Sequence, residues 1–180
     1  MPWRFGRWTS VCLGGEALKS RRLALSAVLA AIALTIFVLE AQIPLPLPVP
    51  GLKLGLSNVV TVFALAVLGW KEALTILLVR IVLGNMFTAQ GVALLYSLAG
   101  GLLSFAVMTL LLRVVKRSQL WVAGVFGGIA HNLGQMAVAV AITRTPALLL
   151  YLPILLLCGI ITGAFTGLCA QLLRNRLTKS

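Results

Sequence analysis

Long apolar stretches follow one another along almost the whole chain, separated by short groups of polar or basic residues. A helix needs about 20 predominantly apolar residues to cross the hydrocarbon layer of a membrane. The pattern therefore predicts an all-α fold, a polytopic membrane helix bundle with six transmembrane helices and short connections. We expect these helices at about 23–39, 54–70, 73–88, 92–112, 121–142 and 147–173.

Composition agrees with a membrane protein. The chain has 180 residues, of which 61% are hydrophobic and 10% charged, and such values are typical of integral membrane proteins. The helices form one transmembrane domain, 23–173, which leaves no room for a soluble domain. A basic segment, 1–22, precedes it and a basic tail, 174–180, follows it. The first segment suits either a cytoplasmic segment on lipid headgroups or a disordered tail.

The basic residues indicate how the bundle is oriented. Twelve of the fifteen lysine and arginine residues fall in the N-terminal segment, in the turns at Lys71 and 113–117, and in the C-terminal tail. Only Lys53 and Arg144 fall in the connections on the other side. Because basic loops stay in the cytoplasm, we expect both termini to be cytoplasmic and the protein to lie in the inner membrane. Topology and contact with anionic lipid thus explain the formal charge of +12, and no nucleic-acid partner is expected.

The connection between the first two predicted helices is rich in proline. Residues 40–53, EAQIPLPLPVPGLK, carry four prolines at alternate positions, which exclude helix and favour stiff extended backbone. The segment is also apolar for a loop in water. We therefore expect it to fold back over the bundle as a lid over a pocket, in preference to a plain connector.

Polar side chains interrupt the predicted helices at particular depths. With the helix directions fixed by the topology, Arg80 and His131 lie near the membrane midplane, and most other strongly polar residues lie toward the outer surface. The inner halves of the helices carry almost none. This one-sided distribution predicts a pocket that opens outward, in preference to a continuous channel. The candidate ligand-binding residues are Lys53, Ser57, Asn58, Arg80, Asn85, His131, Asn132 and Gln135.

One polar pair lies at the start of the second predicted helix. Ser57 or Asn58 could cap that helix. A helix that began there and ended at Gly69 would be too short to cross a membrane unaided. We therefore expect the pair to lie at membrane depth, where polar groups are tolerated only against protein or a cavity.

The stretch 124–142, GVFGGIAHNLGQMAVAVAI, is the centre of this pattern. On a helix, His131, Asn132 and Gln135 lie within an arc of about 100°. Neighbouring helices could satisfy all three side chains, as is common in membrane bundles. We favour a ligand, because three amide or imidazole groups are more than packing needs.

Arg80 makes the chemistry of the predicted ligand more specific. A charge at the centre of a membrane helix costs roughly 2.5 to 3.5 kcal/mol on insertion scales. An ion pair with Glu40, solvation by carbonyl groups or water, or an anionic ligand could offset this cost. Since Lys53 adds a second positive charge, the site is expected to be net positive and to take a small anionic or polar ligand.

Several classes of function are excluded by what the sequence lacks. It has no aspartate and three dispersed glutamates, whereas magnesium-dependent diphosphate chemistry needs clustered carboxylates. Its single histidine and three dispersed cysteines form no zinc motif, and no GxxxxGK[ST] phosphate loop is present. We therefore expect no catalytic residue, no metal site and no cofactor in this chain. Active transport would need a separate ATPase.

Three segments resemble a known membrane family. They are PGLKLGLSNVVTVFALAVLGWKEAL at 50–74, LGNMFTAQGVALLYSLAGGLLSF at 83–105 and GGIAHNLGQ at 127–135. They are similar to the family called Gx transporter or heptaprenyl diphosphate synthase component I, over about 22–172. KLGLSN and HNLGQ are the more specific parts.

That family in turn resembles, more remotely, the substrate-binding S components of energy-coupling factor transporters. The resemblance implies six helices, an outward pocket under a lid loop, and an alanine-rich first helix that contacts a coupling protein. Ala27 and Ala31 match this AxxxA contact. S components often have an aspartate after the lysine of the KLGLSN region, and Gly55 stands here instead, so the identity of the ligand is not implied.

Two functions follow as expectations. The first is an S-component-like protein that binds a small molecule for uptake, depends on a coupling protein and ATPases, and is linked to isoprenoid, quinone or flavin metabolism. The second is a non-catalytic membrane subunit associated with heptaprenyl diphosphate synthase. A purely structural subunit would leave the outer polar residues without a ligand.

Overall fold

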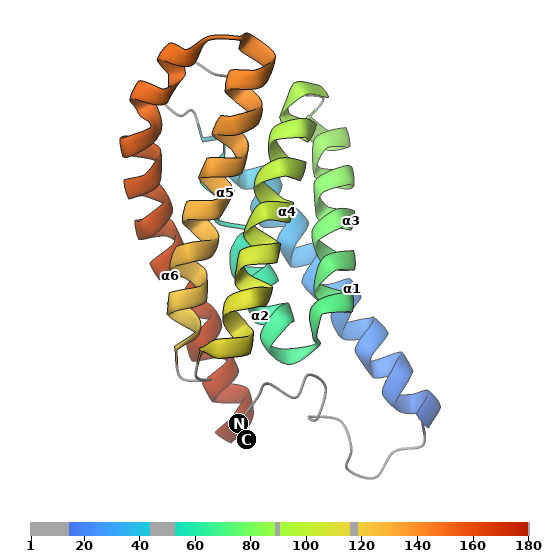
Figure 1. Ribbon diagram of the computed structural model, residues 1–180. Helices are drawn as coiled ribbons and strands as arrows, with labels where there is room; N and C mark the ends of the chain where they lie inside the picture. Colours follow the sequence, from blue (N-terminus) through green and yellow to red (C-terminus); the bar gives the residue numbers. More distant parts are fainter. Residues whose placement is uncertain (1–14, 44–52, 89–90, 116–118, 180) are drawn as a thin grey trace.

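The computed structural model describes residues 15–43, 53–88, 91–115 and 119–179. In these ranges the chain forms six α-helices and one 3-10 helix and contains no strand, which confirms the all-α fold. The helices pack as one elongated bundle (Figure 1). Their bounds are α1 Gly15–Glu40, α2 Asn58–Val67, α3 Trp70–Thr88, α4 Gly91–Val114, α5 Leu120–Thr143, η2 Pro146–Tyr151 and α6 Leu152–Lys179.

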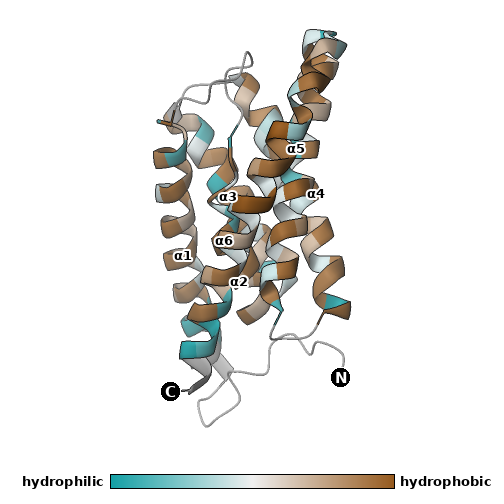
Figure 2. Cartoon of the chain, turned by 90° about the vertical axis from the view of Figure 1, so that its left-hand side faces the viewer, coloured by the Kyte–Doolittle hydropathy of each residue, from teal (hydrophilic) through white to brown (hydrophobic). Residues whose placement is uncertain are grey.

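Among the described residues, four helical segments are long and apolar enough to cross a membrane: 19–40, 91–114, 120–143 and 146–176. Hydrophobic residues, drawn in brown in Figure 2, occupy most of the length of the helices. Large apolar side chains such as Leu150, which is 80% exposed, point away from the bundle. A bundle in water would not show so much exposed apolar surface, so these side chains face lipid. The protein is therefore a multi-pass membrane protein.

The second predicted span differs from the observed helix. The sequence pattern predicts a crossing helix over 54–70, but α2 has only ten residues. At 1.5 Å per residue it is about 15 Å long, half the hydrocarbon thickness. Gly55 has a φ of +81°, in the left-handed region, so the helix cannot begin earlier. Helix α3 is longer, but it carries three charged residues and is not among the four candidate spans.

The first turn of α1 and the last turn of α6 lie at the same end of the bundle (Figure 1). Helix α1 begins at Gly15, eight residues before the predicted start, because good helix formers continue the pattern upstream. An ion pair of 3.5 Å between Arg22 and Glu72 joins the first half of α1 to the start of α3. Trp70 and Trp121, both at this end, are 47% and 43% exposed, as expected for an aromatic belt.

Helices α5 and α6 are in close contact through glycines. A Cβ atom on Gly124 would collide with the carbonyl oxygen of Gly163, and one on Gly128 with the carbonyl oxygen of Gly159. Only glycine lets the two backbones approach so closely. The glycines of α6 at 159 and 163 thus form a packing surface that fixes the position of α5.

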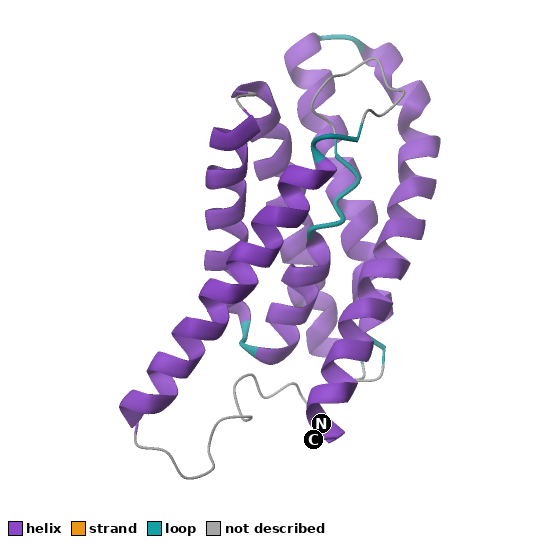
Figure 3. Ribbon diagram, turned by 180° about the vertical axis from the view of Figure 1, so that it is seen from behind, coloured by secondary structure: helices purple, strands orange, loops and turns teal. Residues whose placement is uncertain are grey.

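Residues 53–57, which we call the strap, connect to the start of α2 without regular structure. Figure 3 shows this segment as a loop that passes between the helices. Lys53 and Ser57 are 5% and 2% exposed. Non-helical backbone at membrane depth is tolerated where protein buries it, and the strap meets that condition.

Candidate functional site

Gln135 on α5 holds the beginning of the strap. Its Oε1 accepts a hydrogen bond from the Lys53 backbone N–H at 2.9 Å, and its Nε2 donates to the Lys53 carbonyl at 3.2 Å. The side chain is 2% exposed. A single amide thus satisfies both backbone groups of one strap residue, as a neighbouring strand would.

His131 lies one helical turn before Gln135 and touches the same segment. Gln135 Nε2 is within hydrogen-bonding distance of His131 Nε2. Because an amide nitrogen can only donate, His131 Nε2 is the acceptor and the neutral ring carries its proton on Nδ1. A Cβ atom on Gly55 would lie 2.8 Å from His131 Cδ2. Gly55 is therefore required both for its backbone conformation and for this close approach.

Arg80 on α3 is 1% exposed. Its Nη2 donates to Asn58 Oδ1 at 2.8 Å, which ties α3 to the start of α2. Its Nε and Nη1 have no hydrogen-bond partner within the described ranges. Leaving such donors unpaired in a buried position costs about 1 to 3 kcal/mol each.

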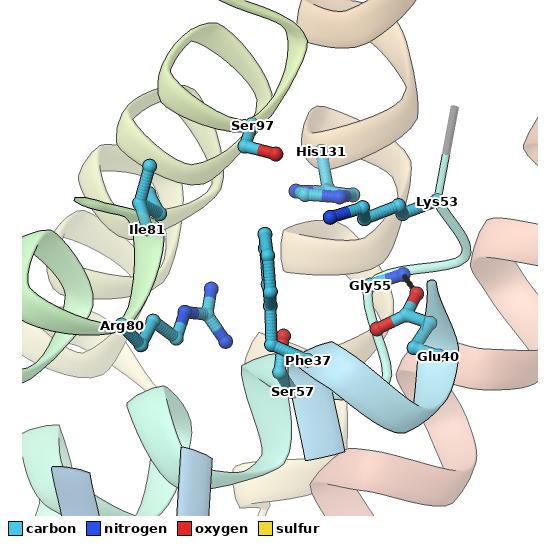
Figure 4. Close-up of a pocket in the computed structure, with 9 residues that line it drawn as sticks. All are labelled: Phe37, Glu40, Lys53, Gly55, Ser57, Arg80, Ile81, Ser97 and His131. Carbon is cyan, nitrogen blue, oxygen red and sulfur yellow. Dashed lines mark hydrogen bonds between the residues drawn. The ribbon is translucent and has the colours of Figure 1, made fainter. Parts of the chain in front are cut away.

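An ion pair between Glu40 and Arg80 is one of the three predicted ways to offset the buried charge. The part of the chain that the structure describes contains no such pair within 4 Å. The Glu40 carboxylate accepts a hydrogen bond from the Gly55 N–H instead. In Figure 4 the ring of Phe37 stands between the Arg80 guanidinium and the Glu40 carboxylate. The charge of Arg80 is therefore left without a direct counter-ion.

Lys53 brings a second cation to the site. Its Nζ lies 3.3 Å from the centroid of the Phe37 ring, a cation–π contact. It has no hydrogen-bond partner among the described residues.

These side chains surround a small cavity (Figure 4). Its free volume is about 10 Å³, about the space that one water molecule needs. A larger ligand requires part of the lining to move. The lining residues are Phe37, Glu40, Lys53, Gly55, Ser57, Arg80, Ile81, Ser97 and His131.

Hydrogen-bond donors outnumber acceptors among the unsatisfied groups of the lining. Lys53 Nζ, Arg80 Nε and Arg80 Nη1 are buried donors without a partner in the described chain. The only unpartnered buried carboxylate oxygen in that part of the chain is Glu40 Oε2. With two cations and one carboxylate, the cavity is suited to a group that accepts hydrogen bonds and carries negative charge.

The predicted site residues fall into three groups. Lys53, Ser57, Arg80 and His131 line the cavity, and Asn58 and Gln135 hold lining residues in place. Two others bond elsewhere. They are Asn85, whose Nδ2 donates to Ile81 O at 2.7 Å, and Asn132, whose Nδ2 donates to Leu155 O of α6 at 2.5 Å.

Sequence reasoning did not include Phe37 and Glu40 among the ligand-binding residues. Ala33, Phe37 and Glu40 are all buried and follow a spacing of four and three residues, which places them on one face of α1. That spacing could have identified the face that points into the bundle. Ala27 and Ala31 lie outside it and are exposed, with no ligand-facing role.

The fold and the site together define a helical membrane protein with a buried, cationic cavity next to a non-helical strap. The chain belongs to the family described as heptaprenyl diphosphate synthase component I, which matches residues 29–173. This confirms the resemblance inferred from the sequence. Comparisons with curated proteins and with solved structures give no match.

Proposed function

We propose that the chain is the membrane-embedded substrate-binding component of an uptake transporter for a small molecule with a negatively charged group. The observation that carries this proposal is the excess of buried, unpartnered donors on Arg80 and Lys53. A protein that only needed packing would gain stability by replacing such groups with apolar ones. A ligand that accepts hydrogen bonds from both residues gives a reason for their presence.

The orientation in the membrane is part of the proposal. Basic residues lie where the chain enters α1 and α3 and where it leaves α4 and α6, all at one end of the bundle (Figure 1). By the positive-inside rule this end is cytoplasmic. The strap and α2 would together make one of six crossings, and the membrane would be the inner membrane. The proposed cavity would then be reached from outside. Most of the lid predicted at 40–53 lies outside the described residues.

Energy for uptake would come from a separate ATPase module and a coupling protein. Ala27 and Ala31 are exposed on α1, so a partner helix could approach them closely. This is the placement expected for an S-component contact. The link to isoprenoid, quinone or flavin metabolism belongs to the same proposal.

A second candidate is a non-catalytic membrane subunit associated with heptaprenyl diphosphate synthase. The description of the family favours it. Within the described residues no three His, Cys, Asp or Glu side chains come together to hold a metal. Magnesium-dependent chemistry would therefore be the task of the partner.

Mass spectrometry of molecules that co-purify with the protein separates these candidates. Wild type, Arg80→Gln and the control Arg113→Gln, which changes an exposed arginine at the end of α4, would be purified in lipid nanodiscs. Transport predicts an anionic small molecule with wild type and Arg113→Gln but not with Arg80→Gln, together with an ATPase. A prenyl diphosphate synthase as the partner would support the second candidate. Equal amounts of the same anion with all three proteins would contradict the role of Arg80.

A further inference from the structure

The last turn of α1 occupies part of the candidate site. Phe37 and Glu40 are 3% and 4% exposed, and both line the cavity (Figure 4). A Cβ atom on Gly84 would collide with the Phe37 ring, so the ring fills the space that this glycine leaves open. With a free volume of about 10 Å³, the cavity cannot take a molecule larger than water unless this turn moves.

The strap provides a position for an anion, and Glu40 fills it. The N–H of Gly55 donates to the Glu40 carboxylate, and the N–H groups of Leu56 and Ser57 follow in the same strap. The next three N–H groups, from Asn58 onward, already bond to strap carbonyls. Ser57 makes no side-chain capping bond to α2. The carboxylate thus satisfies the Gly55 amide just before α2 begins, at the positive end of the helix dipole.

Glu40 uses only part of what the cavity offers to an anion. Arg80 Nε, Arg80 Nη1 and Lys53 Nζ line the same cavity and have no partner among the described residues, although both side chains are more than nine-tenths buried. These donors are an observation independent of the strap amides. An anion held by the amides and by both cations would satisfy groups that Glu40 leaves unpaired.

We propose that in the ligand-free protein the Glu40 carboxylate occupies the position in which the ligand binds. The carboxylate of the ligand then displaces Glu40 from the strap and binds Arg80 and Lys53 as well. The proposal rests on the proposed function and narrows the negatively charged group to a carboxylate, because a carboxylate already fits the amides. Glu40 ends α1, and Gln42 and Ile43 just beyond it are exposed. The displaced side chain can therefore leave with the end of the helix, and Phe37 leaves with it.

Binding of simple anions by Glu40→Gln tests the proposal. The glutamine keeps an acceptor for the Gly55 N–H but removes the competing charge. Wild type, Glu40→Gln, Arg80→Gln and the control Glu72→Gln would be titrated in nanodiscs with benzoate and with inorganic phosphate by calorimetry. We expect Glu40→Gln to bind benzoate at least about tenfold more tightly than wild type, because a like charge is removed from the site. Glu72→Gln should match wild type, and Arg80→Gln should lose binding.

The outcomes distinguish failure of the inference from failure of the proposed function. Benzoate binding that Arg80→Gln loses and Glu40→Gln leaves unchanged or weakens would overturn the role of Glu40 and leave the function intact. Tighter binding of phosphate than of benzoate by Glu40→Gln would overturn the carboxylate class. If neither wild type nor Glu40→Gln bound any anion, or Arg80→Gln bound as wild type does, the proposed function itself would fail. A Phe37→Ala variant, which enlarges the cavity without changing its charge, should bind benzoate more tightly than wild type.

Discussion

The contact between α5 and α6 is closely packed, whereas the surroundings of the strap contain unsatisfied polar groups. At the first, glycines bring two backbones together so closely that no added carbon atom fits. At the second, buried cations remain without partners in the described chain, and a small cavity is left open. The first region is satisfied by the protein alone, whereas the second is not.

Helix α5 takes part in both regions. Its glycines at 124 and 128 lie against α6, while His131 and Gln135, further along, reach the cavity and the strap. The rigid contact therefore holds the helix that positions the strap. Close packing in one half of the bundle thus allows the other half to keep unsatisfied polar groups.

The largest expected effect comes from breaking the rigid region. Gly163→Val would drive side-chain atoms into the backbone of α5, where an added Cβ already lies 2.8 Å from Val125 Cα. We expect the variant to lose about 3 kcal/mol of stability or more and to be recovered in low yield. Thermal unfolding and size-exclusion chromatography measure this. Gly91→Val is the control, because an added Cβ at Gly91 meets nothing within 4 Å.

Removing the link between the two regions should have the next largest effect. Gln135→Leu loses both hydrogen bonds to the Lys53 backbone and leaves those buried groups unpaired. We expect a loss of about 2 kcal/mol and faster hydrogen exchange in the strap than in α6. Gln119→Leu, at an exposed position before α5, should change neither quantity. Unchanged exchange of the strap in Gln135→Leu would show that other contacts hold it.

Replacing the unsatisfied cation should instead stabilise the protein. Arg80→Met removes two unpaired donors and a buried charge but also one hydrogen bond to Asn58, so the ligand-free protein should gain about 1 kcal/mol and a higher Tm. The same variant should not bind benzoate. Arg113→Met, on the exposed end of α4, should leave the Tm unchanged. A lower Tm for Arg80→Met would mean that Arg80 serves the fold and not a ligand.

The smallest expected effect is a pH dependence that comes from Lys53. A lysine ammonium group loses its proton at high pH, whereas the guanidinium of arginine stays charged. Benzoate binding should therefore weaken as the pH rises toward the range in which Lys53 loses its charge. In Lys53→Arg, which stays charged, the profile should be flatter. Glu40, Arg80 and His131 face Lys53 across the cavity in both proteins, so the difference between the two profiles reports Lys53. Identical pH profiles in wild type and Lys53→Arg would show that Lys53 does not cause the pH dependence.

The rigid region could be predicted well from the sequence, and the strap only in part. Glycines four residues apart on an apolar helix have few meanings other than close packing, and the structure agrees. The burial of Ser57 and Asn58 also followed, because a helix between them and Gly69 is too short to cross a membrane unaided. The left-handed turn at Gly55 did not follow, since hydropathy carries no information on φ.

The partners of the polar side chains could not be predicted from helix periodicity. Periodicity places His131, Asn132 and Gln135 on one arc, but this arc faces two different neighbours, the strap and α6. Gln135 bonds to the strap, and Asn132 bonds to the backbone of α6. Glu40 was predicted to begin the lid loop, yet it ends a buried helical turn and lines the cavity. The prolines of the predicted lid, 44–50, lie outside the described residues.

The central claim is that the unpaired donors of Arg80 serve an anionic ligand. Its most direct test is the Nε–H resonance of Arg80 in protein labelled with ¹⁵N-arginine, held in lipid nanodiscs and titrated with benzoate. The spectrum of Arg80→Gln assigns the signal. We predict that the Arg80 Nε–H resonance shifts in a saturable manner at the benzoate concentrations at which calorimetry detects binding, while the Arg113 Nε–H resonance stays in place. An Arg80 resonance that does not move while benzoate binds would contradict it.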